Sequence, residues 1–145
     1  MNNLNLIRYK TNAGQTIGSG AITVINYEDL VYDPYFLVTT GANWVFTANH
    51  AGYYMVQAMA IFTTTDAWAL GEIGTLMLYK NGGQFSVLDF KDNYSADANL
   101  MALHGNDLVY MAVGDTLDIR IYQGTGGNLD LYNDGDYNYV SIWKI

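Results

Sequence analysis

The sequence contains no cysteine and a single proline, Pro34, among its 145 residues. Without cysteine there is no disulfide, which argues against a small extracellular module hardened by disulfides. The length is that of one domain, and a domain of this size buries about 68–70% of its unfolded surface, so it needs no covalent staple. The scarcity of proline leaves glycine, with 15 copies, as a main turn residue.

Charged residues are also scarce, at 14% of the chain, whereas apolar residues make up 50%. The few charges are unbalanced, because 14 acidic and 6 basic side chains give a net charge of −8. A domain this acidic repels phosphate backbones and anionic lipid, so we expect neither nucleic acid nor a membrane as a direct partner. With so little charge, part of the apolar surface has to be hidden in a core or at an interface.

Long hydrophobic runs are missing as well. The longest strongly apolar run, residues 53–62, is roughly half the length that a membrane-spanning helix needs. The first residues carry neither a basic start nor an apolar block, so we expect no signal peptide. No stretch shows a convincing apolar stripe with the 3.6-residue period of a helix.

What the sequence does contain is alternation of apolar and polar residues, interrupted by turn residues. The clearest turn is Asn81-Gly82, the strongest short hairpin signal, which separates two alternating segments. About eight to ten short strands with regular turns predict an all-β, antiparallel sandwich. We expect strands at residues 22–27, 44–48, 53–63, 74–80, 84–90, 108–113, 116–122 and 139–145. Residues 1–18 form a polar lead with one alternating piece, and residues 19–145 form the sandwich domain.

Two of the expected strands are apolar on both faces. In the last strand Tyr139, Trp143 and Ile145 lie on one side, and Val140 and Ile142 lie on the other. The long strand behaves in the same way, with Met55 and Met59 opposite a second apolar row. A strand of an antiparallel sandwich needs only one apolar face, so the second face is covered by something. A symmetric copy of the chain is the simplest cover, and a loop folded back over the face is the alternative.

Four motifs, taken in order, resemble those of the complement globular heads and the tumour-necrosis-factor-like proteins. Phe46 precedes Gly52-Tyr53-Tyr54 with the spacing of the opening motif of that family, and the chain ends on an aromatic-rich strand. The segments 76–82 and 111–115 resemble the family's strand-plus-hairpin and its Gly-Asp turn, the latter followed by the strand at 119–124. The resemblance implies a jelly roll that forms a homotrimer. We predict that the trimer contact contains Tyr122, Tyr139, Trp143, Ile145, Met55 and Met59.

One segment points to a particular branch of this group. Residues 32–44 are longer than in animal members, and their end, Thr39-Thr40-Gly41-Ala42-Asn43-Trp44, is similar to versions in structural proteins of tailed bacteriophages. The resemblance implies a non-enzymatic capsid decoration (cement) protein. It would be made in the host cytoplasm and would bind the major capsid protein, or another virion component, on the virion surface. Residues 1–18 would then be a capsid-docking arm, anchored by Leu4, Leu6, Ile7 and Tyr9.

A second interpretation is a receptor- or carbohydrate-binding head of a phage fibre or cell-surface appendage, in which exposed tyrosine and tryptophan stack on sugar rings. No set of catalytic residues supports an enzyme. The two histidines, His50 and His104, are far apart in the sequence, and no nucleophile motif is present. We expect no cofactor. A loose Ca²⁺ site built from Asp134 and Asp136 is the one metal hypothesis, and a solvated turn is the alternative.

Overall fold

The computed structural model describes residues 5–63, 68–94 and 101–145. Part of the segment between the strands expected at residues 84–90 and 108–113 therefore lies outside the described residues. The described part contains no helix that could cross a membrane. Its strands are β1 (Leu6–Lys10), β2 (Thr16–Ile17), β3 (Thr23–Val24), β4 (Asp29–Tyr32), β5 (Val38–Thr39), β6 (Val45–Thr47), β7 (Gly52–Ile61), β8 (Ile73–Lys80), β9 (Gly83–Asp92), β10 (Ala102–Met111), β11 (Thr116–Gln123), β12 (Leu129–Asp130) and β13 (Tyr139–Lys144).

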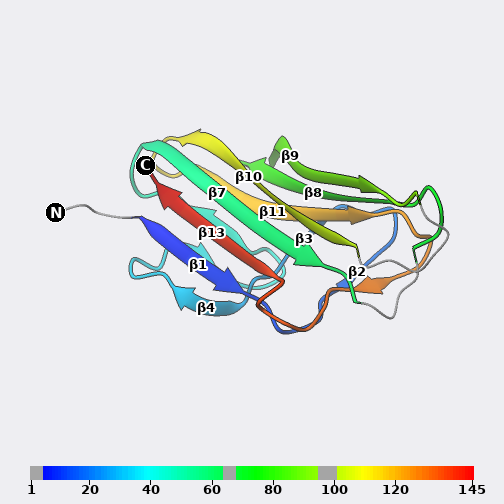
Figure 1. Ribbon diagram of the computed structural model, residues 1–145. Coiled ribbons are helices and arrows are strands. Elements are labelled where there is room, and N and C mark those ends of the chain that lie inside the picture. Colours follow the sequence, from blue (N-terminus) through cyan, green and yellow to red (C-terminus); the bar gives the residue numbers. More distant parts are fainter. Residues whose placement is uncertain (1–4, 64–67, 95–100) are drawn as a thin grey trace.

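These strands form two sheets that pack face to face (Figure 1). The first, called here the β7 sheet, has the order β10-β7-β13-β1-β4. The second, called the β8 sheet, has the order β5-β6-β11-β8-β9, and β3 pairs with β11 beside it. A short ladder of β12 and β2 lies at one end of the sandwich. Apart from the consecutive pairs β5–β6 and β8–β9, neighbours along the sheets are not consecutive in the sequence, which is the connectivity of a jelly roll.

The long strand and the last strand are direct neighbours, because β13 pairs with β7 along its whole length. Val140 and Ile142 point into the sandwich and are fully buried, as are Val56 and Ala58 opposite them. The intervening side chains point outward. The prediction that both strands are apolar on two faces is therefore confirmed, and one of those faces belongs to the core of the sandwich.

The expected hairpin at Asn81-Gly82 is confirmed. Asn81 and Gly82 have φ angles of 51° and 78°, and they alone separate β8 from β9. Two successive residues with positive φ form the type I′ turn, whose twist matches that of the flanking strands. Asparagine and glycine are the residues that adopt this conformation at least cost, which is why the sequence signal was strong.

The lead at residues 1–18 is not a separate arm from residue 5 onward. β1 pairs with β13 on one side and with β4 on the other, so it lies inside the β7 sheet. Ile7 is fully buried and Tyr9 is 5% exposed, with the Tyr9 ring packed edge-on against Trp44 at 6.1 Å between centroids. The domain boundary expected at residue 19 is therefore wrong. The lead looked separable because its strand is short and flanked by polar residues.

Candidate interaction surface

The outer face of the β7 sheet is the side that turns away from the β8 sheet. Strand register places one apolar row across it, with Leu108 beside Met55, Met55 beside Trp143, and Trp143 beside Leu6. Leu108 is 44% exposed, and the other three are partly exposed. Residues directly opposite each other on one face of a sheet are close enough to pack. The row is therefore a continuous apolar strip that crosses four strands.

A polar row follows on the same face. It consists of Asn106, Gln57, Ser141 and Arg8, in register on β10, β7, β13 and β1. The Arg8 guanidinium donates a hydrogen bond to the Ser141 hydroxyl at 2.8 Å and lies 4.4 Å from the centroid of the Tyr139 ring. Arg8 therefore lies along the sheet instead of extending into solvent, and its charge stacks on an aromatic face.

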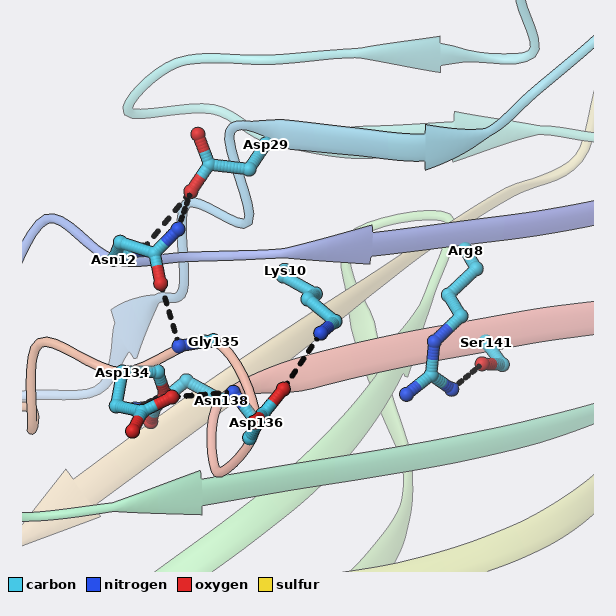
Figure 2. A network of polar contacts seen from close by, with 9 residues as sticks. All are labelled: Arg8, Lys10, Asn12, Asp29, Asp134, Gly135, Asp136, Asn138 and Ser141. Atoms are coloured by element: carbon cyan, nitrogen blue, oxygen red, sulfur yellow. Dashed lines mark hydrogen bonds and ion pairs between the residues drawn. The ribbon is translucent and has the colours of Figure 1, made fainter.

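The next row contains His104, Met59, Tyr139 and Lys10. The Lys10 ammonium is 2.8 Å from the Asp136 carboxylate, a contact visible in Figure 2. This hydrogen bond, together with the lysine charge, lowers the pKa of Asp136 below its usual value. The two basic residues of the outer face, Arg8 and Lys10, thus both have partners from their own chain.

The Asp136 loop is fastened beside this face by further polar contacts (Figure 2). The Asn12 amide donates to the Asp29 carboxylate at 2.8 Å, and the Asn12 carbonyl oxygen accepts from the Gly135 backbone N–H at 2.6 Å. Asn138 is fully buried and donates to backbone carbonyls of the same loop. These contacts join the loop before β13 to the ends of β1 and β4, and they hold that border of the face in place.

The outer face is also hollowed. A depression of about 200 Å³ is lined by Met55, Gln57, Asn106 and Trp143. It lies where the apolar row meets the polar row, so one wall offers hydrocarbon and sulfur and the other offers amide donors and acceptors. A side chain from another molecule that is apolar with a polar tip would match both walls.

Four of the residues predicted for a trimer contact come together on this face. Tyr139 lies opposite Met59, and Trp143 lies opposite Met55, so the two strands present alternating aromatic and thioether groups. Ile145 is 71% exposed just beyond β13, and its backbone N–H bonds to the Tyr53 carbonyl. These positions agree with a shared surface, and the contact itself stays a prediction.

Tyr122 does not belong with this group. It lies on β11 in the β8 sheet, opposite Thr75, with the fully buried Ile121 and Gln123 on either side. Its side chain therefore points away from the sandwich on the opposite layer from Trp143. Alternation along β11 showed which residues share a face, but it carried no information about which sheet holds the strand.

The residues expected to anchor the docking arm do not lie together in the structure. Ile7 and Tyr9 belong to the core, so neither is available to a partner. The Tyr9 hydroxyl donates to Asp33 at 3.0 Å, and burial together with this carboxylate raises the pKa of Tyr9 to about 12. Leu6 is on the outer face of the β7 sheet, and Leu4 lies outside the described residues. The face also contains Leu108 and a Tyr53–Tyr110 pair, 5.3 Å apart between centroids, which only strand register could place there.

The hypothesised Ca²⁺ ligands have other contacts. The Asp136 carboxylate bonds to Lys10, and the Asp134 carboxylate accepts the backbone N–H of Asp136 at 2.9 Å. Across residues 5–63, 68–94 and 101–145, no group of three or more histidine or acidic side chains is placed to hold a metal ion. The loop is instead organised by hydrogen bonds of its own aspartates, as in other turns rich in Asp and Asn.

Comparison with known proteins identifies the fold. No family model matches the sequence, and no curated protein matches it. Among solved structures, murine APRIL matches with a TM-score of 0.69 and 10% identity, covering 99% of this chain and 100% of that one. The Eiger TNF of S. frugiperda matches at 0.66 and 13%, covering 98% and 92%. The globular domain of zebrafish complement 1qA matches at 0.66 and 14%, covering 97% of both chains.

The fold is the TNF- and C1q-like jelly roll. The resemblance found in the sequence motifs is thereby confirmed, and so is the all-β class. At these low identities the likeness establishes the fold alone. Within this TNF- and C1q-like jelly roll, strand register assembles an apolar row on the outer face of the β7 sheet. The similarity of residues 39–44 to phage structural proteins stays a prediction.

Proposed function

We propose that this protein is a non-enzymatic structural head that assembles into a homotrimer through the outer face of the β7 sheet. The observation that carries the proposal is the apolar row of Leu108, Met55, Trp143 and Leu6 on a face with no cover among the described residues. Soluble monomers rarely expose large contiguous apolar patches, so a patch of this kind indicates an interaction site. The homotrimer implied by the motif resemblance provides a cover of matching chemistry.

A threefold ring is closed by one repeated head-to-tail contact, so the centre of the outer face has to meet a different region of the neighbouring copy, such as the border of its sheet. β10 is the edge strand of the β7 sheet, and Leu108 and Tyr110 on it are 44% and 51% exposed. Docking this edge against the Trp143 region of the next copy would bury both groups. Each 100 Å² of apolar surface hidden in this way contributes about 2.5 kcal/mol before association costs.

The proposed place of the trimer is the capsid surface of a tailed bacteriophage, as a decoration protein bound to the major capsid protein. The support is the resemblance of residues 39–44 to versions in phage structural proteins, together with the threefold assembly proposed above. Because Ile7 and Tyr9 are core residues, the docking surface has to use other side chains.

Two measurements test the proposal separately. Light scattering at micromolar concentration should give three times 16.1 kDa, and a monomer would contradict the assembly. The purified protein should then sediment with phage capsids that have been stripped of decoration protein, and not with fully decorated capsids. If the protein is a trimer but does not bind stripped capsids, the capsid role is contradicted and the assembly is not.

A further inference from the structure

A second hollow, of about 300 Å³, lies at the end of the sandwich where β2 and β12 pair. This end is opposite the one where β13 finishes (Figure 1). The lining that matters for its chemistry comes from Gly14, Thr63, Asp130, Leu131, Tyr132 and Asn133. Its size is at the small end of ligand pockets, which corresponds to a small molecule or to one unit of a larger one.

The walls of this end pocket are tied together by backbone hydrogen bonds. The Leu131 N–H donates to the Gln15 carbonyl, and the Thr63 N–H donates to the Asp130 carbonyl, both at 2.9 Å. Leu131 itself is 1% exposed and anchors the segment in the core. Three chain segments that are distant in the sequence are thus fixed relative to one another. A ligand would meet a preformed site and would lose little affinity to ordering the protein.

Gly14 lines the pocket without a side chain of its own. Its φ of 63° is in the left-handed region, which favours glycine. A Cβ at this position would lie 3.4 Å from the Leu131 carbonyl oxygen and 3.6 Å from the Asn133 Cβ. A larger side chain would therefore extend between the walls, and glycine leaves that space to solvent or a ligand.

The polar groups of the pocket suit hydroxyl groups. The Thr16 hydroxyl donates to Asp130 Oδ1 at 2.5 Å and thereby orients the carboxylate. Asn133 is exposed and offers both amide donors and a carbonyl acceptor. An acceptor-only carboxylate and a donor–acceptor amide on one segment complement a pair of adjacent hydroxyls, each of which donates and accepts.

The remaining lining suits a sugar ring. Tyr132 is partly buried, and its ring packs edge-on against Tyr137 at 6.0 Å between centroids, which fixes its orientation. An aromatic side chain beside hydrogen-bonding groups contacts the C–H face of a saccharide. Asp130 is the charged side chain in the lining and is negative, so anionic ligands such as uronic acids and phosphates are disfavoured.

We propose that the end pocket binds one residue of a neutral saccharide, with Asp130 and Asn133 holding its hydroxyl groups and Tyr132 contacting its ring. The proposal is independent of the trimer, because the pocket lies on one protomer and shares no lining residue with the outer face. It adds a ligand class to a protein whose proposed role so far is assembly.

The test is a titration of the ¹⁵N-labelled full chain followed by two-dimensional NMR. The probes are the methyl glycosides of glucose, galactose, mannose and N-acetylglucosamine, each up to about 50 mM. At least one should shift the backbone amides of residues 130–133 saturably, with a dissociation constant on the order of 1 mM. Methyl glucuronide should bind at least about tenfold more weakly than the best neutral probe.

Two variants make the test specific. Asp130→Asn keeps an oxygen that can accept from Thr16 but loses the charge, and Asn133→Ala removes an exposed side chain, so both should fold normally. Each should weaken binding about tenfold or more, whereas Glu28→Gln, at an exposed carboxylate elsewhere, should leave binding unchanged. Absence of shifts with all four probes, or equal shifts in Asp130→Asn, would overturn the proposal. A response to methylammonium and to none of the sugars would also overturn it, in favour of a cation site.

Discussion

Trp143 on β13 lies directly opposite Met55 on β7, and both side chains project from the outer face of the β7 sheet. The next pair along the same two strands, Ile142 and Val56, projects the other way and is fully buried. Adjacent residue pairs on these two strands therefore point alternately to the outer face and into the core. One side of this strand pair builds the core, and the other side carries part of the apolar row that is proposed to meet a second copy.

The first prediction concerns this outward pair. Trp143→Asp should abolish self-association, because a carboxylate in the middle of the apolar row would have to be desolvated without a counter-charge. The inner face of β13 is untouched, so the β-rich circular dichroism spectrum should persist. Light scattering should report a single-chain mass for the variant.

A matched control is Phe36→Asp. Phe36 is 85% exposed in the loop between β4 and β5 and has a φ of 54°, a conformation that aspartate accepts more readily than phenylalanine. This variant should assemble as the parent protein does. Equal masses for both variants would contradict the role of Trp143.

The second prediction concerns the contact between the edges of the two sheets. A Cβ on Gly105 of β10 would lie 2.2 Å from the backbone carbonyl oxygen of Leu88 on β9. A backbone atom cannot move aside as a flexible side chain can, so the two edges would have to separate. Gly105→Ala should lower the free energy of unfolding by about 3 kcal/mol, measured by urea denaturation.

Gly83→Ala provides the comparison for this prediction. At Gly83 a Cβ would be 3.7 Å from the Lys80 carbonyl oxygen, which is an ordinary contact. This substitution should change the free energy of unfolding by less than about 1 kcal/mol. If the two alanine variants were equally stable, the close approach of β9 and β10 would be refuted.

The third prediction concerns Asn138, which is fully buried. Its amide carbonyl accepts the Ile61 N–H at 3.0 Å, and its amide nitrogen donates to the Tyr132 carbonyl at 2.6 Å. Asn138→Ala would leave both backbone groups without a partner and should cost about 2–3 kcal/mol in a denaturation experiment. Asn43→Ala, at an exposed asparagine, should be nearly neutral.

The fourth prediction is a pH dependence. The Asn81 side-chain amide, the Ala112 N–H and the Lys80 ammonium all donate to Asp115, and they lower the pKa of this carboxyl from 3.8 to about 2. Between these values the folded protein keeps the carboxylate charged while the unfolded chain binds a proton. The stabilisation is therefore complete above pH of about 4 and is lost as the pH falls toward 2.

Asp115→Asn should consequently flatten the fall in stability over that acid window and lower the stability at neutral pH. Denaturant unfolding at a series of pH values measures both effects. The charge-matched control is Glu28→Gln, at an exposed carboxylate in another loop. If the pH dependence of the free energy of unfolding were unchanged in Asp115→Asn, these three donors would not lower the pKa of Asp115 in solution.

Several features were predictable because they depend on neighbours in the sequence. The two-residue turn at Asn81-Gly82 needs only local φ preferences. The two-sided apolar pattern of the last strand needs only the period of two that any strand has. β10 was less predictable, since it begins at Ala102 and not near Leu108. Its first half carries Gly105, Asn106 and Asp107, which have low strand propensity, and pairing with β7 outweighs that preference.

The candidate surfaces were harder to foresee, because they depend on which strands become neighbours. Tyr122 and Trp143 have similar sequence contexts, yet they belong to opposite sheets. Ile7 and Tyr9 looked like the anchors of a separate lead, yet β13 and β4 recruit their strand into the β7 sheet. The end pocket joins segments near residues 14, 63 and 131, and no spacing along the chain indicates that they meet.

By itself the sequence determined that this protein is a β-sandwich with tight glycine turns and more apolar side chains than one core requires, because composition and alternation are properties of the chain alone. The tertiary structure decided which of those side chains share a face, since strand order and register bring distant segments to within a few ångströms of each other. Local preferences choose the strands, and long-range pairing chooses the surfaces that they form.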